Sequence, residues 1–74
     1  MQRAWYRDRY KLVVGQDASR ELYDLETDPD ETNNLALQNN FRHELQSMEM
    51  ELAQAMHDKD DRCTAILGIL HRAQ

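Results

Sequence analysis

The sequence lacks several features that would assign it to a specialised class of protein. Its 74 residues contain one cysteine, Cys63, so the chain forms no internal disulfide and no cysteine-rich zinc site. No apolar run approaches the roughly 20 residues that span a bilayer, and the N-terminus lacks the apolar core of a signal peptide. If the chain is part of a longer protein, any signal would lie upstream, and Met1 would be either an added start or an internal residue. The compartment therefore stays open among periplasmic, secreted and cytoplasmic.

Positive charge is scarce and is concentrated near the N-terminus. The net charge is −5, yet four basic residues precede residue 12: Arg3, Arg7, Arg9 and Lys11. Nucleic-acid binding needs a broad basic surface, so we expect no nucleic-acid partner. The lack of a long apolar run predicts no membrane partner. The hydrophobic fraction of 41% and the charged fraction of 31%, with few glycines and prolines, indicate a soluble, mostly helical globular domain. A core of this size stabilises a fold only marginally.

Aromatic and β-branched residues in WYRDRYKLVV predict a half-buried strand over about residues 5–14. The even-numbered positions of this strand carry its apolar side chains: Tyr6, Tyr10, Leu12 and Val14. Asp8 falls at one of the same positions and is the polar residue that weakens the pattern. The segment GQDASR at 15–20 predicts a turn, and ELYDL at 21–25 predicts a second strand. An isolated hairpin is marginal in water. We therefore expect a helix to cover one face, with strand edges left open to a further strand.

Helical periodicity begins further along the chain. Apolar residues recur at steps of three and four, which predicts a helix over about residues 40–57 with Asn39 or Asn40 as its N-cap: Phe41, Leu45, Met48, Leu52 and Met56. A second, shorter stripe predicts a helical tail within residues 58–74, capped by Asp60 or Asp61: Cys63, Ile66, Leu67 and Leu70. Ile69 lies off this stripe, so the tail helix is apolar over a wide arc.

The acidic run ELYDLETDPDETNNLA at 21–36 has two interpretations. Asp28 as N-cap, Pro29 at the first helical position and Glu31 reaching back predict a capped turn over 28–34. The alternative is a metal site built from Asp24, Glu26, Asp28, Asp30 and Glu31. The spacing does not fit a calcium loop, which needs acids at alternate positions and a turn glycine. DKDD at 58–61 fails the same test, so we predict no metal site.

Two segments in this order carry a resemblance to a known family. DRYKLVV at 8–14, a short polar turn and ELYDLETDPDETNNLA resemble the C-terminal subdomain of sulfatases, in the alkaline-phosphatase-like superfamily. The resemblance covers residues 5 to about 57, and residues 58–74 match nothing we can name. The residues that carry it are Arg7, Tyr10, Lys11, Leu12, Glu21 to Leu25, Asp28, Pro29, Glu31 and Asn34 to Ala36.

The resemblance implies an α+β fold in which a small antiparallel hairpin or sheet is packed by one long C-terminal helix, and the second apolar stripe adds a short helix after it. Residues 1–57 would form this subdomain of a larger α/β sulfatase fold, and residues 58–74 a tail. The formylglycine of Cys/Ser-x-Pro-x-Arg and the calcium ion would lie in the missing catalytic domain of the parent protein. That domain would be this chain's partner. The chain itself would support it and would not be catalytic alone.

Three types of side chain are candidates for catalytic groups, and each is rejected. Cys63 stands in CTAIL without the proline and arginine of the nucleophile motif, so it is better explained as a buried thiol. His43, His57 and His71 are lone helix-surface histidines. Lys11 would belong to a peripheral strand. We therefore predict no catalytic, cofactor-binding or metal-binding residue in this chain.

Two other functions remain open from the sequence. The chain is alternatively a free-standing interaction module that forms a homo-oligomer through its strand edge and helical stripes. It is also compatible with the C-terminal part of a related phosphatase or phosphonate hydrolase. A subdomain separated from its parent would expose apolar surface and self-associate.

Overall fold

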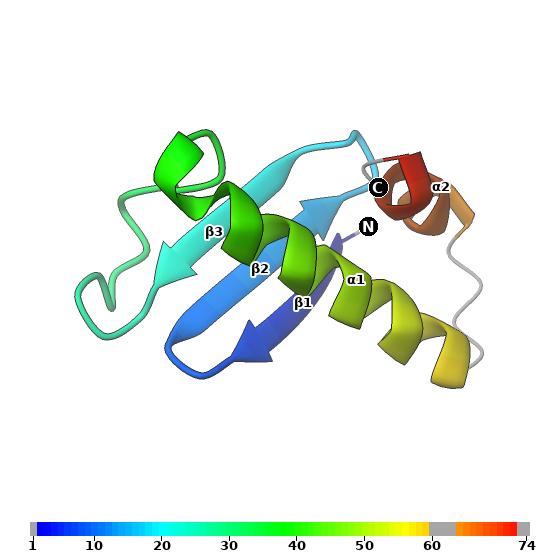
Figure 1. Cartoon of the computed structure of the whole chain (residues 1–74), viewed down its shortest axis with the longest axis horizontal. Helices are drawn as coiled ribbons and strands as arrows, with labels where there is room; N and C mark the ends of the chain where they lie inside the picture. The colour runs from blue at the N-terminus through cyan, green and yellow to red at the C-terminus, as the bar shows by residue number, and fades with distance from the viewer. Residues whose placement is uncertain (1, 60–63, 73–74) are drawn as a thin grey trace.

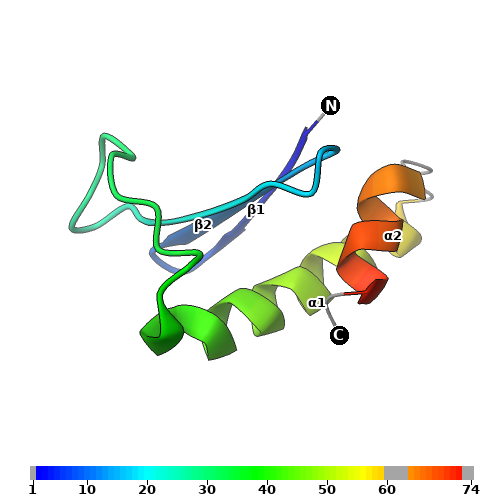
Figure 2. The ribbon, with the colours of Figure 1, turned by 90° about the horizontal axis from the view of Figure 1, so that it is seen from above.

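The computed structural model describes residues 2–59 and 64–72, which form an α+β fold of two layers (Figure 1). Strands β1 (Gln2–Arg7), β2 (Tyr10–Gly15) and β3 (Arg20–Asp24) form an antiparallel sheet in the order β1-β2-β3. Helix α1 (Arg42–Asp58) crosses one face of this sheet, and α2 (Thr64–Arg72) lies at the end where β1 begins (Figures 1 and 2). The predicted α+β class, with a small antiparallel sheet, one long helix and a shorter second helix, is confirmed.

The single strand predicted over residues 5–14 is wrong. The chain reverses at Asp8 and Arg9, and Arg7 pairs with Tyr10 across a hairpin. Asp8 has a φ of 53°, in the left-handed region that aspartate adopts more readily than most residues. The segment therefore supplies two strands, and the first begins at Gln2.

The reversal also corrects the predicted faces of these strands. Trp5 pairs with Leu12, and their side chains lie on the face that α1 covers. Tyr6 pairs with Lys11 on the opposite face and is 60% exposed, although the parity pattern placed it with Leu12. The Lys11 Nζ lies 5.8 Å from the centre of the Tyr6 ring, a cation–π distance.

The predicted second strand and the turn before it are confirmed to within one residue. The Gly15 N–H donates to the Ser19 carbonyl at 2.9 Å, and the Ala18 N–H donates to the Gly15 carbonyl at 3.1 Å. Ala18, with a φ of 71°, takes the left-handed conformation. A Cβ at Gly15 would clash with the Ser19 hydroxyl and lie 2.7 Å from an Asp17 oxygen, so a larger residue there would displace these two turn side chains.

The capping box predicted for residues 28–34 is wrong, and this segment is not helical. The Asp28 carboxylate accepts from the backbone N–H groups of Thr32 (3.1 Å) and Asn33 (2.9 Å), beyond the positions expected for a helix cap. The Glu31 N–H closes a turn on the Asp28 carbonyl at 3.0 Å, and Glu31 has a φ of 56°. The Glu31 carboxylate binds Lys11 instead of reaching back to Asp28.

The long helix is confirmed, but its predicted cap is wrong. Asn39 and Asn40 lie inside a 3-10 turn, η1 (Asn39–Phe41), that runs directly into α1. Neither Gln38 nor Phe41, which precede η1 and α1, makes a side-chain capping bond. The Phe41 ring instead packs edge-on against Tyr10 of β2, with 6.3 Å between ring centres. A contact between the two layers thus marks where the helix begins.

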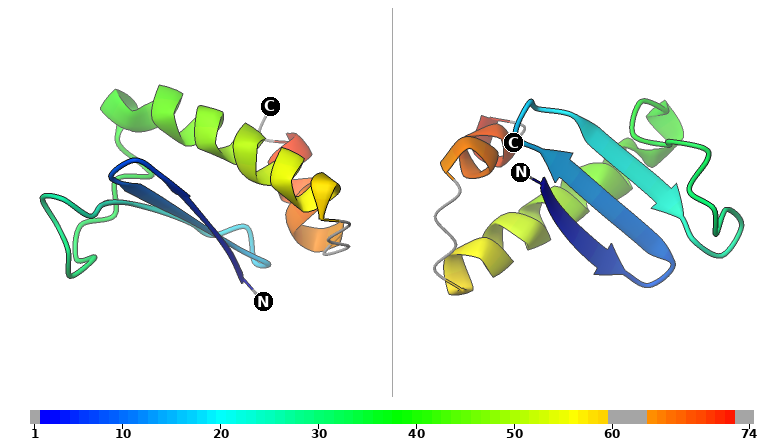
Figure 3. Two further views of the ribbon diagram at one scale, coloured as in Figure 1. Left: turned by 90° about the horizontal axis from the view of Figure 1, so that it is seen from below. Right: turned by 180° about the vertical axis from the view of Figure 1, so that it is seen from behind.

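The hydrophobic core lies between the sheet and the two helices (Figure 3). Its fully or nearly buried members include three from the sheet and three from α1: Leu12, Val14, Leu22, Met48, Leu52 and Met56. Helix α2 adds Ile66 and Leu70 as predicted, together with Ile69, so its apolar arc is wide. The proposed caps Asp60 and Asp61, and Cys63, lie outside the described residues. No described helix has the length and apolar character needed to cross a bilayer.

Candidate functional site

The acids of residues 24–31 hold loops in place and do not converge on one point. Asp24 accepts from Arg9 Nε at 2.8 Å and from the Glu26 N–H at 3.1 Å, and Arg9 Nη2 lies 2.7 Å from its second oxygen. The hydrogen bond from Arg9 lowers the pKa of Asp24. Among residues 2–59 and 64–72, no three His, Cys, Asp or Glu side chains meet in a way that could hold a metal ion.

Lys11, His43 and His57, which the sequence also suggested as candidates, lie apart from one another. Lys11 Nζ donates to Glu31 at 2.8 Å, and this hydrogen bond raises the pKa of Lys11. His43 and His57 lie on the exposed side of α1. His71 belongs to α2, but its side chain lies outside the described part of the structure. Among the described side chains, the fold thus brings neither His43 nor His57 together with Lys11.

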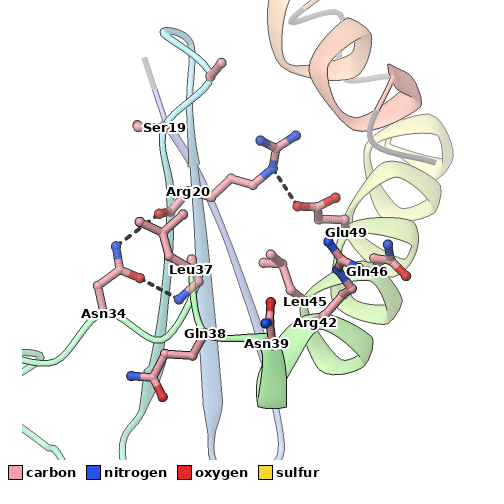
Figure 4. A pocket seen from close by; sticks show the side chains of 12 residues that line it. Ser19, Arg20, Asn34, Leu37, Gln38, Asn39, Arg42, Leu45, Gln46 and Glu49 are labelled. Atoms are coloured by element: carbon pink, nitrogen blue, oxygen red, sulfur yellow. Dashed lines mark hydrogen bonds and ion pairs between the residues drawn. The ribbon is translucent and has the colours of Figure 1, made fainter.

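The structure instead shows an open groove of about 640 Å³ between the start of β3 and the first half of α1 (Figure 4). The segment 34–39, which connects the sheet to the helix, forms its third wall. Most of the side chains around it are polar: Ser19, Arg20, Asn34, Gln38, Asn39, Arg42, Gln46 and Glu49, with Ala18, Ala36, Leu37 and Leu45 as the apolar part.

A charged pair spans the groove from the sheet to the helix. Arg20 Nε lies 2.6 Å from Glu49 Oε1, and the Glu49 side chain is only 2% exposed (Figure 4). The Arg20 Nε is buried as well, and its contact with Glu49 is an ion pair without the angles of a hydrogen bond. Burial raises the pKa of Glu49, and the positive charge of Arg20 opposes that rise.

The arrangement suits binding better than proton transfer. The Nη end of the Arg20 guanidinium points away from Glu49 (Figure 4). Arg42 and Gln46 line the same groove, and guanidinium and carboxamide groups are donors for anionic or strongly polar groups. Glu49 is engaged by Arg20, so its role is to hold the guanidinium in position.

The sequence interpretation missed this pair, although a signal was present. Glu49 stands four residues after Leu45 and three before Leu52, so it falls on the apolar stripe of the helix. An acid at such a position needs a buried partner, because an uncompensated buried charge is costly. Periodicity alone could not name Arg20 as that partner.

Comparison with protein-family models, with curated proteins and with solved structures finds no match for this chain. A functional conclusion therefore rests on the residues and on their contacts.

Proposed function

We propose that the chain is the C-terminal subdomain of a sulfatase, a hydrolase of sulfuric esters, and that it supports a catalytic domain without performing chemistry itself. The supporting observation is that residues of the two resembling segments contact each other. Lys11 of the first segment binds Glu31 of the D-P-x-E turn at 2.8 Å, although 20 positions separate them in the chain.

A second set of contacts joins the E-L-Y-D-L strand to the N-L-A segment. Asn34 Oδ1 accepts from the Leu22 N–H at 3.0 Å, and Asn34 Nδ2 donates to the Arg20 carbonyl at 3.1 Å. The Leu35 N–H donates to the Leu22 carbonyl at 2.8 Å. The motif residues thus form a scaffold in which side chains and backbone fix one another, which is the role expected of a supporting subdomain.

The surface of the chain leaves one face of the sheet open to a larger neighbour. Helix α1 covers only one face of the sheet (Figure 2). On the other face Tyr6 is 60% exposed, and beyond the sheet Leu37 is 94% exposed. The uncovered face of the sheet is available for contact with a neighbouring domain, and single exposed apolar side chains such as these are also normal on a soluble surface. Formylglycine and calcium would belong to that domain and not to this chain.

Two measurements test the proposal. The coding sequence upstream of Met1 should encode a domain of several hundred residues that contains Cys/Ser-x-Pro-x-Arg, and a stop codon directly upstream would contradict the proposal. The longer protein, matured to formylglycine and supplied with calcium, should hydrolyse an aryl sulfate. The 74-residue chain under the same conditions should not, and turnover by it would disprove a purely supporting role.

The same assays separate the related enzyme classes. Preference of the longer protein for a phosphate monoester or a phosphonate ester over the aryl sulfate would assign the chain to a phosphatase or phosphonate hydrolase. A free-standing module that self-associates is the second candidate function, and the open edge of β1 favours it.

A further inference from the structure

The hydrogen bonds of the sheet show which backbone groups of β1 face outward. The Gly15 N–H donates to Ser19 and the Leu25 N–H donates to the Arg9 carbonyl, so the odd-numbered residues of β2 face β3. Its even-numbered residues then face β1, where they pair with odd-numbered residues. Three residues of β1 therefore direct their N–H and C=O groups away from the sheet: Gln2, Ala4 and Tyr6.

The two edges of the sheet differ. On β3, the outward groups of Leu22 are bonded by Asn34 and Leu35. On β1, no described residue bonds the outward backbone groups of Ala4 or Tyr6. Unpaired groups on an edge strand form a template for another strand.

The charges of β1 do not prevent such pairing. Arginines on an edge strand normally discourage a second strand. Here Arg7 is paired on the helix side with Glu44 (2.6 Å) and Glu51 (3.1 Å). Arg3 donates to the carbonyl of Gln2 at 3.0 Å. The strand also contains no proline, so every residue keeps its N–H.

We propose that β1 pairs antiparallel with β1 of a second copy of this chain, with Ala4 opposite Ala4. The two three-stranded sheets would then join into one sheet of six strands across a two-fold axis. This inference does not depend on the chain being part of a sulfatase.

The side chains select this register over the neighbouring one. With Ala4 opposite Ala4, all three outward-facing residues are used, because Gln2 lies opposite the partner's Tyr6. Arg3 then lies opposite the partner's Trp5, a favourable cation–π pairing. In the neighbouring register, Trp5 would lie opposite the partner's Trp5. Gln2 would then lose its hydrogen bonds to the partner strand, and Arg3 would lie directly opposite the partner's Arg7, where the like charges repel. Self-complementarity of this kind favours a second copy over an unrelated strand.

The first test is the association state of the chain and of Ala4→Pro. Proline at this position removes an outward N–H but none of the bonds within the monomer, which edge strands tolerate. Sedimentation from micromolar to millimolar concentration should show a monomer–dimer equilibrium for the wild-type chain and for Ala4→Thr, and a monomer for Ala4→Pro. A wild-type chain that stays monomeric, or an Ala4→Pro dimer of unchanged affinity, would overturn the proposal.

Two further measurements remain decisive even if Ala4→Pro does not fold. Amide exchange should protect Ala4 and Tyr6 at high concentration only, and protection that is independent of concentration would refute the interface. Directly opposed residues of a hydrogen-bonded pair have Cα atoms about 5.5 Å apart, within disulfide range. In a Cys63→Ser background, Ala4→Cys should therefore oxidise to a covalent dimer while Gln2→Cys should not. The reverse result would exclude the register.

Discussion

Arg20 and Glu49 form an ion pair of 2.6 Å that connects the first residue of β3 to the middle of α1. Arg20 is about one quarter exposed, at 27%, whereas the Glu49 side chain is 2% exposed. Water can solvate the Arg20 charge if Glu49 is removed, but it can hardly solvate the Glu49 charge if Arg20 is removed. Replacing either partner should have unequal consequences.

Arg20→Met should destabilise the fold by about 2–4 kcal/mol at neutral pH, because it leaves Glu49 buried without a counter-charge. The pKa of Glu49 is already raised above its ordinary value, so the native state binds a proton more tightly than the unfolded state. Stability is then lost as pH rises through that pKa, and losing Arg20 raises the pKa further. The deficit should be larger at about pH 7.5 than at about pH 5 in urea unfolding.

The double variant Arg20→Met with Glu49→Leu should recover most of this loss, since an apolar pair needs no compensation. Arg42→Met is the matched control, because Arg42 lines the same groove but is exposed. It should change stability by less than about 0.5 kcal/mol. If the loss of unfolding free energy in Arg20→Met does not change with pH, then protonation of Glu49 does not determine that loss.

Asp28 should make the fold sensitive to acid. The backbone N–H groups of Thr32 and Asn33 lower the pKa of Asp28. The stability that its carboxylate contributes is therefore fully present above the pKa of an unfolded aspartate, and it is lost as pH falls through the lowered pKa of the folded state. Asp28→Ala should lower the urea midpoint at neutral pH, and the difference from wild type should narrow below about pH 4. Asp30→Asn is the control on the same loop. A gap that stays constant with pH would contradict this role.

Asn34 should matter more than its neighbour Asn33. The Asn34 carboxamide bonds the Leu22 N–H and the Arg20 carbonyl along the outer edge of β3, whereas Asn33 contributes its backbone N–H to the Asp28 carboxylate. Asn34→Ala should cost about 1–2 kcal/mol, and Asn33→Ala less than about 0.5 kcal/mol. Equal losses in thermal unfolding would show that the edge is not held by the Asn34 side chain.

Local chemistry explains which elements could be predicted. The second strand is bounded by turn residues, and the long helix has a regular apolar stripe, so both follow from near neighbours in the chain. The reversal at Asp8 and Arg9 has no glycine, proline or asparagine to mark it. Its omission merged two strands and assigned Tyr6 to the wrong face, because side chains alternate along a strand.

Tertiary pairing explains what could not be predicted. The capping chemistry of Asp28 and Glu31 was sound locally, but Lys11 on a distant strand offers Glu31 a stronger, charged partner. The groove depends on Arg20 and Glu49 meeting across two layers, a contact that no local pattern records. The partners of such charged residues are set by the tertiary structure, so local sequence patterns cannot predict them.

Arg7 offers a test of how the edge strand is fixed to the helix. Its Nη1 donates to Ser47 Oγ at 2.7 Å, while Glu44 and Glu51 supply the charge. After a discount for partial solvent exposure, Arg7→Met should cost about 1–2 kcal/mol at low salt, and less at about 1 M salt, where exposed ion pairs are screened. Ser47→Ala removes only a hydrogen bond without a second charge, so its loss of about 0.5–1.5 kcal/mol should not change with salt. Urea unfolding of both variants at the two salt concentrations distinguishes the ion pairs from the hydrogen bond. If the Arg7→Met loss of stability does not change with salt, then packing of the Arg7 side chain, and not its charge, holds β1 against α1.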